Sequence, residues 1–97
     1  MRILSKSTLR DFWDAHADAK EPLSAWHQEA KAAEWKVPAD IKARYSGASF
    51  VGENCVVFNI KGNTYRLVVK ISYSYGIVFI RFIGTHAEYD RIDVKEV

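Results

Sequence analysis

Apolar residues in the first part of the chain recur at the spacing of an amphipathic helix. The first apolar stripe consists of Leu9, Phe12 and Trp13. It predicts a helix that ends near His16, and Thr8 with Asp11 fits a capping box at its start. The residues before it, Met1 to Leu4, form a brief apolar run that is typical of a short strand.

Two further helices are expected before residue 46. Pro22 fits the first turn of the second helix, and Pro38 opens a shorter third segment that runs to Arg44 or Tyr45. The second helix presents one apolar stripe, made of Leu23, Trp26, Ala30 and Ala33. We expect Trp13 and Trp26 to lie in the core because they belong to these stripes, whereas Trp35 has either a core role or a role in docking a partner.

From Ser49 onward the pattern changes to a period of two, which indicates strands. Three strands are expected, over residues 55–61, 64–73 and 77–83. Gly62-Asn63 is a plausible two-residue hairpin turn between the first two, and Gly76 lies in the turn before the third. The order of elements predicts an α+β fold of one domain, residues 1–97, with N-terminal helices packed on one face of a twisted antiparallel sheet.

The alternation along these strands assigns side chains to two faces. An entirely apolar set should cover the helices: Phe58, Ile60, Tyr65, Leu67, Val69, Ile71, Val78, Ile80 and Phe82. The opposite, exposed face should then gather Asn59, Lys61, Arg66, Lys70 and Arg81, with Phe79 between the basic residues. The relative register of the strands is an assumption, because a shift of one residue would exchange the two faces.

The distribution of charged residues along the chain is more informative than the net charge. The net charge is only +2, and eight basic and seven acidic residues nearly cancel over residues 1–45. Between Glu53 and Glu88, in contrast, no acidic residue occurs, although four basic ones do. Unopposed positive charge suits a phosphate-bearing partner, but basic residues on the wet face of a sheet are also ordinary. Arg66 and Arg81 favour the first interpretation because a guanidinium fork matches phosphate, and Phe79 could stack on a base or fill a minor core.

The composition bears on the compartment in which the protein acts and on its need for a metal. No stretch approaches the ~20 apolar residues that a membrane span requires, and no apolar secretory segment is visible near the N-terminus. The one cysteine, Cys55, allows no internal disulfide, which is consistent with a reducing cytoplasm. We therefore expect a cytoplasmic protein without membrane contact. No His, Cys or Asp set has the spacing of a metal site, so neither metal nor cofactor is expected, and His16, His27 and Cys55 receive no role.

The segment from Gly84 to Asp90 carries candidate chemistry. The imidazole of His86 is a side chain that can move a proton, and Tyr89 can donate one or orient a hydroxyl. A structural role for a lone histidine is the alternative. The chemical interpretation requires the guanidinium groups of Arg66 and Arg81 and the imidazole of His86 to converge around one phosphodiester.

These stretches resemble a known family. The run from Val56 to Ile71, followed by Ile80 to Asp90 with its Gly-Thr-His-Ala-Glu-Tyr-Asp segment, is similar to the HigB family of type II toxins. The resemblance extends upstream to Ser5–Leu9, Pro38–Lys42 and Ser49-Phe50, and so covers nearly the whole chain.

The resemblance implies a RelE/ParE-type fold whose concave face receives messenger RNA. It implies a ribosome-dependent endoribonuclease that cuts mRNA in the ribosomal A site and is neutralised by a HigA-type helix-turn-helix antitoxin. Operator DNA would be contacted only through that antitoxin. Carried over by position, catalytic roles fall on His86, Tyr89, Arg66 and Arg81, and RNA-binding roles on Lys61, Lys70, Asn59 and Phe79.

The implied reaction is attack of a 2'-hydroxyl on the adjacent phosphorus without a metal. His86 would transfer one proton and Tyr89 the other, while the two arginines would stabilise the charge that grows on the phosphate. Two alternatives remain open at this point: a ParE-like inhibitor of a topoisomerase without chemistry, and a nucleic-acid-binding module without activity.

Overall fold

The helical half of the chain forms as the apolar stripes predict. The computed structural model describes all 97 residues. Its first elements are β1 (Arg2–Leu4), α1 (Lys6–Ala15), a 3-10 turn labelled η1 (Ala17–Ala19), α2 (Lys20–Ala32) and α3 (Pro38–Arg44). The predicted capping box at Thr8 is wrong, because the N-cap of α1 lies three residues earlier, at Ser5, whose φ of 71° turns the chain from β1 into the helix.

The second half forms a sheet followed by a short helix. Its elements are β2 (Ser49–Val51), β3 (Cys55–Ile60), β4 (Tyr65–Ser72), β5 (Ile77–Thr85) and α4 (His86–Tyr89). The strand order is β1-β5-β4-β3-β2. All neighbours are antiparallel except β1, which runs parallel to β5, so the predicted antiparallel sheet carries one parallel strand at its edge and is mixed.

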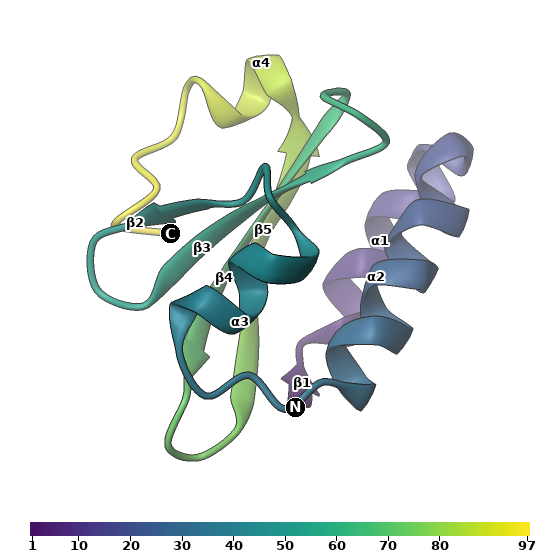
Figure 1. Cartoon of the computed structure of the whole chain (residues 1–97). Coiled ribbons are helices and arrows are strands. Elements are labelled where there is room, and N and C mark those ends of the chain that lie inside the picture. Colours follow the sequence, from purple (N-terminus) through teal and green to yellow (C-terminus); the bar gives the residue numbers. More distant parts are fainter.

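The helices α1, α2 and α3 pack on one face of the sheet, which we call the inner face (Figure 1). It contributes to an apolar cluster of 18 buried residues that includes Leu9, Leu23, Phe58 and Leu67. Trp26 and Trp35 belong to the cluster and Trp13 packs against it, so all three tryptophans are core residues, and the alternative of a docking role for Trp35 is not needed. The fold is therefore α+β, with its stability concentrated between the helices and the sheet.

The opposite face of the sheet, which we call the outer face, has far fewer buried side chains. Only Cys55, Val57 and Val68 are buried there, under a cover made of Val51, Phe82, Tyr89, Val94 and Val97. Part of this cover is the chain after α4, drawn in yellow, which descends on the side of the sheet away from α1 and α2 and ends beside β2 (Figure 1).

A bulge in β5 changes the expected alternation. Val68 pairs with Phe82, but the next residue, Val69, pairs with Ile80, so Arg81 is an extra residue without a partner on β4. The bulge resets the parity beyond it. The placement of Phe82 on the inner face is therefore wrong: Phe82 packs on the outer cluster, and Ile83 takes the inner position.

No helix of the structure has both the length and the apolar character that crossing a membrane requires.

Candidate functional site

Arg66 is the centre of the polar group on the outer face. In the strand register it stands between Asn59 of β3 and Gly84 of β5. Its Nη1 donates a hydrogen bond to Asn59 Oδ1 at 2.5 Å, and its guanidinium carbon lies 5.6 Å from the centre of the Tyr89 ring. Asn59 is itself fixed, since its Nδ2 donates to the carbonyl of Gly47 at 3.2 Å. These contacts hold the guanidinium in one place without neutralising its charge.

Gly84 makes room for this arrangement. A Cβ at this position would lie 2.5 Å from Cζ of Phe82 and 3.3 Å from Cβ of Glu88. The Phe82 ring therefore lies over the backbone of Gly84, in the strand position next to Arg66. Sequence reasoning missed both Phe82 and Gly84, because the bulge that turns the ring to the outer face leaves no signal in the apolar alternation.

The short helix α4 positions His86 and Tyr89. Thr85 caps it through a reciprocal pair of bonds: Glu88 N donates to Thr85 Oγ1, and Thr85 N donates to Glu88 Oε1. The bond from the Thr85 backbone lowers the pKa of Glu88, so this carboxylate stays ionised and keeps the cap closed at neutral pH. The sequence carried a signal for this helix, since Thr85-x-x-Glu88 is the capping-box pattern.

His86 is oriented at both its backbone and its ring. The His86 backbone N donates to the carbonyl of Thr64, in the turn between β3 and β4, at 3.3 Å. Its Nδ1 lies 3.1 Å from Asp90 Oδ2, and 45% of its side chain is exposed. A carboxylate on one nitrogen of a partly exposed ring is the arrangement of an imidazole that can exchange protons with a ligand.

Lys61 does not join the outer face, so its predicted placement there is wrong. It lies in the turn after β3, with a φ of 53°, and its Nζ donates to Asp18 Oδ2 at 2.6 Å. The turn thus comprises residues 61–64, and the strand alternation does not extend to Lys61. Asp18 also accepts a bond from the Tyr65 hydroxyl. The bonds from Lys61 and then Tyr65 lower the pKa of Asp18 and tie the turn to η1.

The remaining predicted residues lie farther along the same face. Phe79 is exposed and stands opposite Lys70 in the register of β4 and β5. Arg81 lies three residues before Gly84, about 10 Å along the strand. Its Nε donates to the carbonyl of Val97 at 3.1 Å. Among the α4 residues, Tyr89 is therefore the one that Arg66 contacts, while Arg81 is engaged by the backbone oxygen of Val97. The convergence of Arg66, Arg81 and His86 around one phosphodiester stays a prediction.

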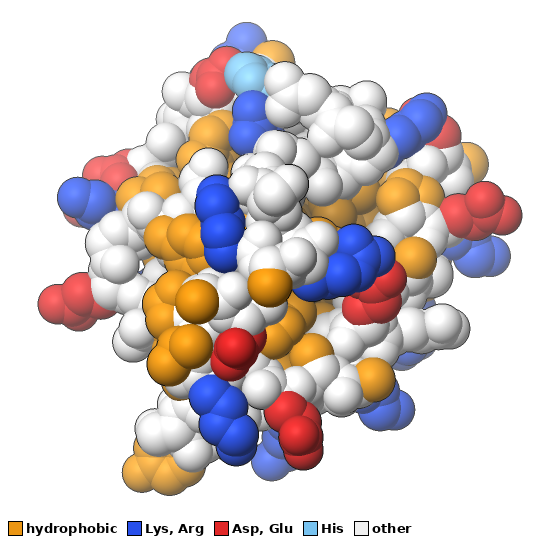
Figure 2. Space-filling model, viewed as in Figure 1, with side chains coloured by type: hydrophobic (Ala, Val, Ile, Leu, Met, Phe, Trp, Pro, Cys, Tyr) orange, Lys and Arg blue, Asp and Glu red, His pale blue; other side chains and the backbone are white.

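The charges of the outer face are largely unopposed by acid. The ion pairs of the molecule are Arg44–Glu29, Lys61–Asp18 and His86–Asp90. Arg66, Lys70 and Arg81 thus have no Asp or Glu side chain within 4.0 Å. The side with α3 in front differs, since acidic and basic side chains are interspersed there and form no patch of one sign (Figure 2). No group of three or more His, Cys, Asp or Glu side chains is placed to hold a metal ion.

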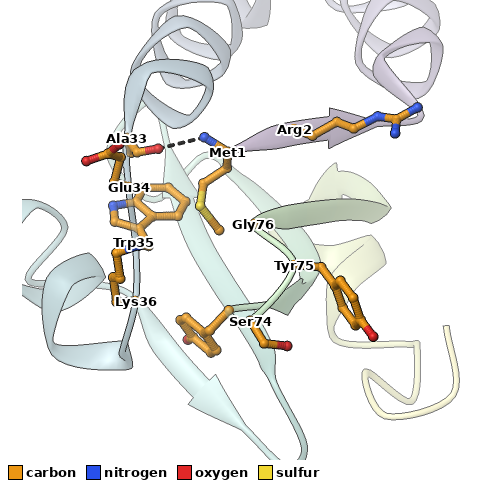
Figure 3. Close-up of a pocket in the computed structure, with 10 residues that line it drawn as sticks. Met1, Arg2, Ala33, Glu34, Trp35, Lys36, Ser74, Tyr75 and Gly76 are labelled. Atoms are coloured by element: carbon orange, nitrogen blue, oxygen red, sulfur yellow. Dashed lines mark hydrogen bonds between the residues drawn. The ribbon is translucent and has the colours of Figure 1, made fainter.

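A hollow of about 380 Å³ beside β1 is separate from this group (Figure 3). It is lined by Met1, Trp35 and Tyr75 among others, and the amino group of Met1 donates to the carbonyl of Ala33 at its wall. Because Gly76 precedes β5 whereas α4 follows it, the hollow lies at the other end of that strand from His86. It contributes nothing to the geometry around Arg66.

Comparison with protein families gives one match. Residues 19–92 match the family described as HigB toxin, the RelE-like toxic component of a toxin-antitoxin system. The matched range contains every residue of the group around Arg66 and the whole sheet except β1. No curated protein matches the chain.

Proposed function

Because the chain belongs to the HigB family of RelE-like toxins, we propose that it is an endoribonuclease that cuts messenger RNA on the ribosome and so arrests translation. The observation that carries the proposal is the position of the Arg66 guanidinium. It is held by Asn59 and Tyr89, has no carboxylate partner, and stands next to the helix that carries His86.

The chemistry follows from what each of these groups can do. Cleavage begins when the 2'-hydroxyl attacks the adjacent phosphorus, and negative charge grows on the phosphate oxygens. Arg66 supplies fixed positive charge and hydrogen bonds at that point. The 2'-hydroxyl loses a proton and the leaving 5'-oxygen gains one. His86, whose Nδ1 is held by Asp90, makes one of these transfers, and Tyr89 makes the other or orients the ribose. The reaction as we propose it uses these side chains without a metal.

The flanking RNA would follow the outer face. Asn59 contacts the nucleotide beside Arg66, Arg81 binds a second phosphate or the scissile one, and Lys70 binds the backbone farther along. Phe79 is exposed beside Lys70, where a base can stack on its ring. Lys61 could reach RNA only by giving up its bond to Asp18, so we assign it a structural role.

As the toxic component of a toxin-antitoxin system, the protein has an antitoxin partner. We propose that this partner is a HigA-type helix-turn-helix protein, through which alone the toxin would meet operator DNA. Both would act in the cytoplasm, where translating ribosomes are found.

Primer extension on mRNA translated in a cell-free system tests the proposal. The wild type is expected to create new 5' ends within codons, and His86→Ala combined with Arg81→Ala to create none. The matched control is His27→Ala combined with Arg10→Ala, which removes the same two residue types from the helical layer and should cleave as the wild type does. Unchanged cleavage by the first double variant would reject the site. Absence of cleavage by the wild type, together with DNA damage in cells, would favour a topoisomerase inhibitor.

A further inference from the structure

The chain after α4 lies across the outer face. We call residues 93–97 the strap. The side chains of Val94 and Val97 pack on the apolar strip formed by Cys55, Val57 and Val68. In Figure 1 this segment runs along the side of the sheet that the helices leave uncovered, and reaches β2. Without it, only Val51, Phe82 and Tyr89 would pack on the strip.

Few interactions hold the strap in place. Arg81 Nε donates to the carbonyl of Val97, and Cys55 Sγ lies 3.9 Å from the carbonyl of Val94. The Lys95 side chain lies over Gly52, where a Cβ would come within 3.6 Å of its Cε. The backbone of the strap donates only within itself, from Glu96 N to the carbonyl of Asp93 and from Lys95 N to the Asp93 side chain. A segment with two apolar anchors and no ladder bonds can open without unfolding the sheet.

The position of the strap matters because of its neighbours on the sheet. Val57 and Val68 stand opposite each other, one alternate position away from Asn59 and Arg66 along β3 and β4. In the other direction along β4 the next outward side chain is Lys70. The strap therefore covers the stretch between Arg66 and Lys70, and it engages Arg81 as well. It contains Asp93, Lys95 and Glu96, a net charge of −1 on a face whose basic residues lack carboxylate partners.

We propose that the strap competes with RNA for the outer face. With the strap in place, the end around Arg66 and α4 and the exposed ring of Phe79 are open to a ligand, but the stretch between them is covered. When the strap leaves, RNA gains the strip over Val57 and Val68 together with the guanidinium of Arg81. This inference rests on the proposed function, since it takes the ligand of that face to be RNA.

A reversible lock tests the competition. Cys55 is the only cysteine of the chain, so Val94→Cys offers it a single possible partner. The oxidised variant should bind a labelled single-stranded oligoribonucleotide of about ten nucleotides more weakly than its reduced form, by about tenfold in dissociation constant. Reduction should restore the affinity. The control combines Val94→Cys with Cys55→Ser, and its binding should not respond to oxidation.

Release of the strap gives the complementary measurement. Val94→Ser combined with Val97→Ser weakens both apolar anchors and should raise RNA affinity several-fold. The matched control, Val37→Ser, changes an exposed valine next to α3 and should leave affinity unchanged. Circular dichroism establishes that each variant is folded.

The outcomes separate this inference from the proposed function. Equal RNA binding by the locked and reduced forms, with no gain in the serine variant, overturns the competition while leaving the nuclease proposal intact. Failure of every folded form, including the serine variant, to bind RNA overturns both the competition and the RNA-binding face on which it rests.

Discussion

The two faces of the sheet are built from the same strands but serve different purposes. On the inner face, side chains of β3, β4 and β5 meet three helices in a cluster of 18 buried residues. On the outer face only Cys55, Val57 and Val68 are buried, and they are covered by a short helix and the strap. Successive residues of β4 alternate between the two environments, so that Arg66 and Leu67 are neighbours in sequence with opposite roles.

This division shows how a chain of 97 residues can support both a core and a charged surface site. Burial on the inner face supplies most of the apolar stabilisation, so the outer face can retain basic residues that form no ion pair. Their mutual repulsion is a cost to folding that a binding partner with phosphate groups would offset.

The largest expected effect on stability comes from the inner face. Phe58 is fully buried, with its ring centre 5.4 Å from that of Trp26 and 5.1 Å from that of Tyr45. Phe58→Ala should lower the free energy of unfolding by about 3 to 5 kcal/mol, because it leaves a cavity among these rings. Val57→Ala, the next residue but on the outer face, should cost about 1 to 2 kcal/mol. Urea denaturation measures both, and equal losses would contradict the division between the faces.

Arg66→Ala, on the outer face, should impair activity and leave stability nearly unchanged. Cleavage of mRNA should fall by about 10²- to 10³-fold, because a preorganised donor at the phosphate is lost. The urea midpoint should change little, since Arg66 is half-buried and its one hydrogen bond goes to Asn59. Arg66→Lys keeps the charge but loses the planar fork, so its cleavage activity should lie between that of the wild type and that of Arg66→Ala. Arg10→Ala, on the helical side, is the control that should leave cleavage unchanged. A midpoint lowered as far as in Phe58→Ala would show Arg66 to be structural.

Thr85→Ala is expected to act locally at the end of β5. It removes the side-chain cap of α4 and should cost about 1 kcal/mol. Because α4 has only four residues, the loss should appear as faster amide exchange of Glu88, whose N donates to Thr85 Oγ1, together with weaker cleavage. Thr64→Ala is the matched control, since the Thr64 carbonyl that holds His86 N is part of the backbone and survives the change. Unaltered exchange at Glu88 would mean that the cap does not hold α4.

The regular part of the fold was predictable from the sequence because it depends on local periodicity. The stripes of α1 and α2, Pro38 at the start of α3, and the alternation along β3 and β4 all follow from neighbours in the chain. The same alternation placed Arg66 and Asn59 together correctly, since a hairpin with a short turn fixes its own register.

The errors arise where tertiary context decides. The bulge at Arg81 moved Phe82 to the outer face, and a positive φ at Lys61 turned that residue toward Asp18. Neither departure is visible in a pattern of apolar and polar letters. The parallel pairing of β1 with β5 and the return of residues 93–97 over the sheet are long-range contacts, which local periodicity does not encode.

The smallest expected effect concerns the hydrogen bond between Lys61 and Asp18, which holds Lys61 away from the outer face. Since the pKa of Asp18 is lowered below its ordinary 3.8 by Lys61 and Tyr65, the ionised carboxylate stabilises the fold. That contribution is complete above pH 3.8 and disappears as the pH falls through the lower folded pKa. Asp18→Asn should therefore melt at a slightly lower temperature than the wild type at neutral pH, and the difference should vanish in acid.

Asp11→Asn, on α1 and without a side-chain hydrogen bond, should show no such dependence. Thermal melts across this pH range measure both, and a difference that stays constant with pH would mean that the carboxylate bonds do not hold the turn. Cleavage at neutral pH should be nearly unaffected by Asp18→Asn, because the turn carrying Lys61 belongs to the helical side of the molecule.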